Sequence, residues 1–198
     1  MNFPQGLITL LRATSKLAAL TGAGASQESG LRTFRDAHPS TRSGQAGLWA
    51  QYKPQDLASP QAFARDPKLV WDWYAWRREA IKSVRPNAGH YALAEMEKKI
   101  SEFTLITQNV DGLHRMAGSK NVLELHGNIL RVRCSECGTF TETWGDDSES
   151  MPRCDKCNGM LRPDVVWFGE SLPRAELEAA VSASRACQVF FSIGTSGV

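Results

Sequence analysis

The sequence predicts an α/β fold, in which a parallel sheet with helices on both faces is interrupted by a helical insertion and by a small four-cysteine module. Four short apolar runs have the length and composition of buried strands, at 17–21, 103–107, 122–125 and 189–193. Helical patterns separate most of them, at 7–15, 90–99 and 174–184. Strands that alternate with helices form parallel sheets that are covered on both faces.

Polar or glycine-rich loops follow all four predicted strands. Ligands bind at the carboxyl ends of the strands in such sheets, where these loops meet. The loops are Gly22-Ala23-Gly24, Gln108-Asn109-Val110-Asp111, His126-Gly127 and Gly194-Thr195-Ser196. We therefore expect one binding site along this edge of the sheet.

Composition excludes several classes of protein. The formal net charge is only +2 and both signs are interspersed, which argues against a nucleic-acid-binding protein. No apolar run approaches the roughly 18 residues of a membrane span. Residues 1–27 contain no acidic side chain, as in a transit peptide, but their apolar spacing favours an amphipathic helix. We predict a cytoplasmic protein that binds neither nucleic acid nor membrane.

Four of the five cysteines form two Cys-x-x-Cys pairs separated by residues 138–153. Two turns that each present two thiolates complete a tetrahedral zinc site, whereas disulfides or reactive thiols are the alternatives. Because four protein ligands leave no open position, we predict one structural zinc ion. The predicted ligands are Cys134, Cys137, Cys154 and Cys157. The remaining cysteine, Cys187, is predicted to be a small core residue.

The turn after the first strand has the composition of a nucleotide-binding loop. Its glycines allow backbone N–H groups to approach a pyrophosphate. The dehydrogenase pattern Gly-x-Gly-x-x-Gly is incomplete because Gln27 takes the place of the last glycine. The acidic residue expected about twenty positions later is also missing, so an ordinary dehydrogenase is a poor match.

Polar residues after the next two strands add possible chemistry. Gln108, Asn109 and Asp111 could form a solvated turn with Asx hydrogen bonds, or could bind a carboxamide and ribose hydroxyls beside a nucleotide loop. His126 could be structural, but its place at a strand end favours a general base.

In combination these motifs resemble the signatures of the sirtuin family, from about residue 17 to the end. Two long motifs carry the resemblance, namely Gly22-Ala23-Gly24-Ala25-Ser26-x-x-Ser29-Gly30-x-x-x-Phe34-Arg35 and Thr107-Gln108-Asn109-Val110-Asp111-Gly112-Leu113-His114. Four shorter features continue it in the same order, namely His126-Gly127, the four cysteines, Pro163-Asp164-Val165-Val166-Trp167-Phe168-Gly169-Glu170 and Gly194-Thr195-Ser196.

The resemblance implies an NAD-dependent protein-lysine deacylase that transfers the acyl group to ADP-ribose and releases nicotinamide. His126 would be the base, and Asn109 and Asp111 would hold the nicotinamide end. Other implied NAD contacts are Gly22, Ala23, Gly24, Ala25, Ser26, Phe34, Arg35, Gln108, Val110, Gly194, Thr195 and Ser196. An acylated lysine would enter on an extended strand of the substrate protein, bound through Val165, Phe168, Gly169 and Glu170.

The resemblance also divides the chain into three parts. A Rossmann-like domain would comprise 1–35, 86–128 and 164–198, with a cofactor-loop and helical insertion at 36–85 and the zinc module at 129–163. Sirtuins continue past the Gly-Thr-Ser loop with further sheet and with adenosine-binding loops, whereas this sequence stops at Val198. We therefore expect an exposed sheet edge and an exposed apolar face. Two alternatives stay open, a non-catalytic protein that binds acylated peptides or partners, and a protein mono-ADP-ribosyltransferase.

Tyr74 and Arg77 suggest the acyl preference. They are three residues apart on a predicted helix and so share a face, whereas Arg78 is turned about 100° away. One interpretation is that Tyr74 is a core residue and that Arg77 is solvated. The sirtuin branch that removes succinyl and malonyl groups carries Tyr-x-x-Arg here, which implies activity on these acyl groups as well as on acetyl-lysine.

Overall fold

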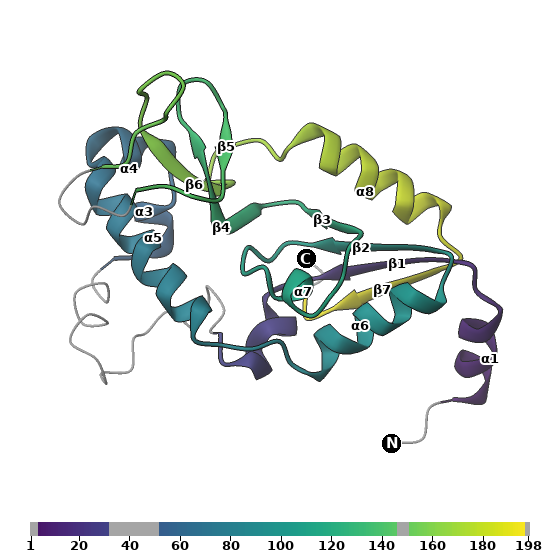
Figure 1. Ribbon diagram of the computed structural model, residues 1–198. Helices are drawn as coiled ribbons and strands as arrows, with labels where there is room; N and C mark the ends of the chain where they lie inside the picture. The colour runs from purple at the N-terminus through teal and green to yellow at the C-terminus, as the bar shows by residue number, and fades with distance from the viewer. Residues whose placement is uncertain (1–3, 32–51, 146–150, 197–198) are drawn as a thin grey trace.

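The structure is a computed structural model that describes residues 4–31, 52–145 and 151–196 (Figure 1). Its larger sheet has four parallel strands in the order β3-β2-β1-β7. These strands are β1 (Lys16–Thr21), β2 (Glu102–Thr107), β3 (Val122–Glu124) and β7 (Val189–Ile193). The predicted parallel sheet is confirmed, and each strand lies within one residue of its predicted bounds.

Helices cover both faces of this sheet, as predicted. Leu17 and Ala19 of β1 pack in one cluster with Leu93 of α6 (Ala88–Lys99). The intervening Ala18 packs with Ala180 of α8 (Arg174–Ala186). Successive side chains of a strand point to opposite faces, so an apolar run without alternation is required where both faces are buried. Figure 1 shows α6 and α8 on opposite sides of the sheet.

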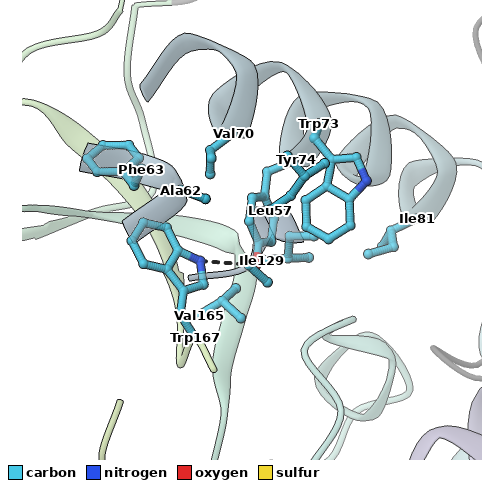
Figure 2. Packing of buried hydrophobic residues seen from close by; sticks show 11 residues of the cluster. Leu57, Ala62, Phe63, Val70, Trp73, Tyr74, Ile81, Ile129, Val165 and Trp167 are labelled. Carbon is cyan, nitrogen blue, oxygen red and sulfur yellow. Dashed lines mark hydrogen bonds between the residues drawn. The ribbon is translucent and has the colours of Figure 1, made fainter. Parts of the chain in front are cut away.

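The helical insertion contains α3 (Pro54–Leu57), α4 (Pro60–Arg65) and α5 (Pro67–Lys82). Helices α4 and α5 each begin with a proline in the first turn and a capping side chain. In α4, Ser59 accepts a hydrogen bond from the N–H of Ala62, and in α5, Asp66 accepts one from the N–H of Leu69. Helix α5 packs an aromatic face against the second sheet, as Figure 2 shows for Trp73 and Tyr74.

The second sheet is antiparallel, in the order β5-β4-β6, and carries the cysteines. Its strands are β4 (Gly127–Cys134), β5 (Phe140–Thr141) and β6 (Leu161–Val165). The sequence did not reveal these strands, because charged side chains interrupt their apolar pattern. Ion pairs satisfy those charges across the chain: Arg131 of β4 binds both Glu124 and Asp164.

Three short helices complete the fold. Helix α1 (Gln5–Ala13) precedes β1 as predicted, although none of its residues is fully buried. The glycine-rich turn continues as a 3₁₀ helix, η1 (Ala23–Ser29), rather than as an α-helix. Helix α7 (Leu113–Met116) follows the loop after β2. None of the helices in the described residues has the length and apolar character needed to cross a membrane.

Strand β7 forms one edge of the described sheet, because it pairs with β1 on one side only. Phe190 of β7 is 45% exposed. Helix α8 also carries exposed apolar side chains, Leu177 and Val181. An exposed strand edge and exposed apolar side chains favour association.

The turns after β1 and β7 contact each other closely through their backbones. The N–H of Gly24 donates to the carbonyl of Gly194 over 2.9 Å, and that of Gly22 donates to Ile193 over 3.0 Å. Gly194 has a φ of +63°, and a Cβ at this position would lie 2.2 Å from the backbone nitrogen of Ala25. Only glycine combines this φ with so close an approach.

Gly194→Ala should therefore lower the free energy of unfolding by more than about 1 kcal/mol, since both the conformation and the space are incompatible with a methyl group. Urea denaturation measures this change. Gly6→Ala in α1, where a Cβ meets nothing within 4 Å, is the matched control and should not destabilise. Equal unfolding midpoints for Gly194→Ala and the unchanged chain would contradict the prediction.

Candidate functional site

The carboxyl ends of β1, β2 and β3 border one cavity of about 440 Å³, and α5 lies across from them. Most of the residues predicted for catalysis and for the nicotinamide end meet there. The predicted residues that line this cavity, the NAD-type pocket, are Ala23, Ser26, Arg77, Gln108, Asn109, Val110, Asp111 and His126.

A buried hydroxyl holds two of these loops together. Ser26 Oγ donates to Asp111 Oδ2 over 2.7 Å and accepts from Asn109 Nδ2 over 3.1 Å. The same amide nitrogen donates to the carbonyl of Gly22, and Asp111 Oδ1 accepts from the N–H of Leu113. Both N–H groups of Asn109 are thus used within the chain, which leaves its carbonyl oxygen as the group that can bind a ligand.

His126 is held in one tautomer. Its Nδ1 lies 2.9 Å from the carbonyl oxygen of Gln108. A carbonyl only accepts hydrogen bonds, so in the neutral ring Nδ1 carries the proton and Nε2 has the free lone pair. This arrangement suits a general base that faces the NAD-type pocket.

Tyr74 and Arg77 share a face of α5 but have different surroundings. Arg77 lines the NAD-type pocket, with its guanidinium carbon 5.0 Å from the ring of Trp73. Tyr74 is only 2% exposed, and its hydroxyl accepts a hydrogen bond from the indole of Trp167 (Figure 2). Burial raises the pKa of Tyr74 to about 12, so its hydroxyl stays protonated. Burial also lowers the pKa of Arg77 from its ordinary value, while Tyr74 opposes that shift.

Arg78 points away from the NAD-type pocket, as predicted. Its guanidinium carbon lies 4.6 Å from the ring of Trp71 and 5.2 Å from that of Trp144. Trp71 packs in one cluster with Cys134 and Cys154. Helix α5 therefore contacts the NAD-type pocket with Arg77 and the cysteine module with Arg78.

The predicted substrate segment begins at Val165, the last residue of β6. Val165 is buried and pairs with Gly127, whereas Phe168 is 51% exposed and Gly169 has a φ of +88°. Glu170 is bound within the chain, because Arg162 donates to both of its carboxylate oxygens over 2.6 and 2.9 Å. Burial raises the pKa of Glu170, but the hydrogen bonds from Arg162 and the Trp167 N–H outweigh it and hold that pKa below its ordinary value.

The remaining predicted contacts lie outside the lining of this pocket. Gly22 is buried behind it, and Gly194 is engaged with Gly24 through backbone. Thr195 and Ser196 follow at the end of β7. Ala25 and Gly24 line a neighbouring pocket instead. Phe34 and Arg35 lie outside the described residues.

Part of the apolar wall of the NAD-type pocket was not predicted from the sequence. Leu31, Trp76, Ala80 and Ile81 also line it. Helical spacing could have predicted Ile81, because it is four residues after Arg77 and so lies on the same face of α5.

The four predicted metal ligands come together. Their sulfur atoms all lie within 4.8 Å of one another, and none of them is in a disulfide. With Zn–S bonds of about 2.3 Å, tetrahedral zinc requires sulfur atoms about 3.8 Å apart. Two of the pairs, Cys134 with Cys157 and Cys137 with Cys154, are 3.4 and 3.7 Å apart. The four cysteines are thus placed to bind a metal ion, and the donor set and spacing fit structural zinc.

The chain has a parallel sheet covered on both faces, a polar pocket at the strand ends and a four-cysteine metal site. These features define the class of dinucleotide-binding α/β proteins that carry a zinc module. Residues 22–198 match the sequence profile described as the Sir2 family. The chain belongs to this family, the sirtuins, and the predicted resemblance is confirmed.

Two relatives with curated names support this assignment. A protein of Aquifex aeolicus named NAD-dependent protein deacylase is 54% identical over 183 residues, which cover 92% of this chain and 73% of that protein. A protein of the same name from Pyrococcus furiosus is 50% identical over 200 residues, which cover 98% of this chain and 77% of that protein.

Solved structures agree with the fold. A Sir2 homologue in complex with NAD has a TM-score of 0.87 and 45% identity, and the match covers all of this chain and 74% of that structure. A structure described as Sir2 bound to acetylated peptide has a TM-score of 0.79 and 31% identity, and the match covers 97% of this chain and 75% of that structure.

Removing one cysteine ligand should release the metal. Cys134→Ala should reduce zinc well below one ion per chain and lower the melting temperature, because structural zinc contributes on the order of 10 kcal/mol to the folding of small modules. Elemental analysis of the purified protein measures the metal. Cys187→Ala, outside the cluster, is the control and should keep one zinc per chain. One zinc per chain in Cys134→Ala would refute the site.

Proposed function

We propose that this chain is an NAD-dependent protein-lysine deacylase. The NAD-type pocket, which brings Asn109, Asp111 and His126 together at the strand ends, carries this proposal. The names of the curated relatives support it. When bound, NAD would supply a ribose carbon that becomes electrophilic as nicotinamide leaves and that the acyl oxygen of the substrate could attack. With the addition of one water molecule, the products would be nicotinamide, free lysine and O-acyl-ADP-ribose.

The polar residues of the NAD-type pocket bind and orient the nicotinamide end. The carbonyl oxygen of Asn109 and the carboxylate of Asp111 accept hydrogen bonds from a carboxamide or from water. Ser26 fixes the position of both side chains. Gln108 follows β2 directly and is assigned to the ribose.

His126 accepts a proton at Nε2 from a ribose hydroxyl. The bond between Nδ1 and the Gln108 carbonyl keeps this nitrogen unprotonated and aligned, and it stabilises the imidazolium once the proton has moved. Trp76 and Ile81 provide apolar surface that excludes water from the same pocket.

The substrate backbone pairs with the segment 165–170 as an added strand. Val166 and Phe168 already donate their N–H groups to the carbonyls of His126 and Ala58, so the peptide uses the other backbone groups of this segment. Backbone pairing gives affinity with little demand on sequence. The exposed ring of Phe168 covers the acylated lysine.

His126→Tyr should lower the deacylation rate by at least about a hundredfold while sparing fold and zinc, since a general base contributes factors of 10²–10⁴. Nicotinamide release is measured with and without an acylated peptide. Thermal melting and zinc content serve as controls for the fold. A near-normal rate in His126→Tyr would remove this residue from the mechanism.

The same assay separates the alternative functions. Release that depends on an acylated peptide supports deacylation, and release that leaves ADP-ribose on a protein without need of an acyl group indicates mono-ADP-ribosyl transfer. Peptide binding without any release indicates a non-catalytic protein.

We further propose that negatively charged acyl groups, succinyl and malonyl, are preferred substrates and that acetyl-lysine is also accepted. Arg77 and His126 both line the NAD-type pocket, and the planar guanidinium of Arg77 can bind a terminal carboxylate with two hydrogen bonds. Tyr74 is buried and does not belong to the lining, so Arg77 carries this proposal and the protonated hydroxyl of Tyr74 is assigned only a supporting role.

Arg77→Met should therefore cut desuccinylation by about 10- to 150-fold, which corresponds to the roughly 1.5–3 kcal/mol of a charged hydrogen bond, and should change deacetylation far less. The ratio of kcat/KM on succinyl and acetyl versions of one peptide measures this. Arg78→Met removes the same charge from a face of α5 about 100° away, which packs on Trp71 and Trp144, and should leave the ratio unchanged. If Arg77→Met lowers both activities equally, Arg77 supports the fold and does not recognise the acyl group.

A further inference from the structure

His126 lies in the turn that joins the two sheets. Strand β3 of the parallel sheet ends at Glu124, and β4 of the antiparallel sheet begins at Gly127. The ring meets the carbonyl of Gln108, in the loop after β2, through Nδ1. Any rotation of one sheet against the other would therefore move the ring relative to that carbonyl. The position of the proposed base depends on how firmly β3 and β4 are held together.

A hydrogen bond between two side chains spans this turn. Asn128 Nδ2 donates to Glu124 Oε1 over 2.8 Å, so the residues two before and two after His126 are joined. We call this bond the turn bridge. Asn128 Oδ1 accepts from the N–H of Leu130 over 2.9 Å, which fixes the orientation of the amide. Glu124 and Asn128 are each only 8% exposed, so water competes little for the turn bridge.

Two arginines hold the carboxylate of Glu124 in place. Arg115 Nε of α7 donates to Oε1 over 3.1 Å, and Arg131 Nη1 of β4 pairs with Oε2 over 3.4 Å. Arg131 Nε also donates to Asp164 of β6 over 2.5 Å. These bonds tie β3 to both β4 and β6. A buried carboxylate that accepts from three donors keeps one orientation, because any other would leave polar groups unpaired.

The backbone of the turn is fitted to β6. Gly127 pairs with this strand and has a φ of +79°. A Cβ at this position would overlap the carbonyl oxygen of Asp164, so only glycine allows the approach. The carbonyl of His126 accepts from the N–H of Val166 over 2.9 Å. The turn is thus tied to β6 through main chain and to β3 through the turn bridge.

We propose that Glu124 and Asn128 are positioning residues for His126, and that the turn bridge keeps Nδ1 of the ring at the Gln108 carbonyl and Nε2 free to accept a proton. This inference rests on the proposed role of His126 as the base. Neither Glu124 nor Asn128 belongs to the lining of the NAD-type pocket, so both act through the turn. Misplacement of a reacting group by about 1 Å can cost roughly a hundredfold in rate, so loss of the turn bridge should lower kcat rather than weaken substrate binding.

Exchange of the two groups tests the turn bridge. Asn128→Asp keeps an acceptor for the Leu130 N–H but replaces the donor with a second carboxylate. The kcat of deacylation should fall by about 10- to 100-fold, with little change in KM. Adding Glu124→Gln returns an N–H donor to the turn bridge in the reverse direction and restores the total charge. The double variant should therefore recover most of the lost kcat.

Asn121, just before β3, provides a matched control. Its side-chain amide donates to the carbonyl of Phe103 over 2.6 Å. Asn121→Asp therefore removes a hydrogen bond of the same kind at the other end of the strand. It should lower the melting temperature but leave kcat unchanged, because the turn bridge stays intact.

The ring of His126 reports its own position without turnover. In the zinc-loaded unchanged chain, ¹⁵N signals of this ring should show a protonated Nδ1 and an unprotonated Nε2. In Asn128→Asp they should shift toward a mixture of the two tautomers. Asn128→Ala removes the donor without adding a charge and should give the same shift, which covers the case that Asn128→Asp does not fold. Melting temperature and zinc content check the fold of each variant.

Three results would overturn the proposal. They are unchanged ring signals and kcat in the Asn128 variants, a double variant no faster than Asn128→Asp, and an equal loss of kcat in Asn121→Asp. Failure of the deacylase proposal looks different, because nicotinamide release is then absent from the unchanged chain or persists in His126→Tyr. The ring signals still decide in that case whether the turn bridge fixes the tautomer.

Discussion

The hydroxyl of Ser26 is the contact on which the organisation of the site depends. It donates to Asp111, accepts from Asn109 and meets His90. These bonds fix the loops after β1 and β2 and the start of α6 relative to one another. Since all of these groups are buried, loss of the hydroxyl would leave several polar atoms without partners, each at a cost of about 1–3 kcal/mol. A single side chain thus sets the geometry of two neighbouring cavities.

The parallel sheet and the metal site could be predicted because their signals are local in the sequence. A strand buried on both faces requires an unbroken apolar run, such as Leu17–Leu20, and this pattern places its bounds within a residue. The two Cys-x-x-Cys turns are equally self-contained, because each turn brings two thiolates to one side. The residues of the NAD-type pocket were predictable for the same reason, since carboxyl ends of parallel strands always meet.

The features that were missed depend on partners far away in the chain. Strands β4 and β6 contain Arg131 and Arg162, whose charges are acceptable there only because Glu124, Asp164 and Glu170 lie opposite them. Helical spacing correctly placed Tyr74 and Arg77 on one face, but it could not show that the tyrosine hydroxyl accepts from Trp167. The tautomer of His126 follows from a hydrogen bond to the Gln108 carbonyl that no sequence pattern encodes.

The ion pair between Arg162 and Glu170 has a consequence for the entropy of binding. The guanidinium carbon of Arg162 lies 3.3 Å from the centre of the Trp167 ring, and Glu170 also accepts from the Trp167 N–H. The turn after β6 is therefore held rigid before any peptide arrives. In the strand pairing proposed above, an incoming peptide would lose only its own conformational freedom, so affinity would not have to come from side chains of a particular sequence. Such a preorganised edge would accept many different polypeptides and distinguish them mainly by the group on the lysine.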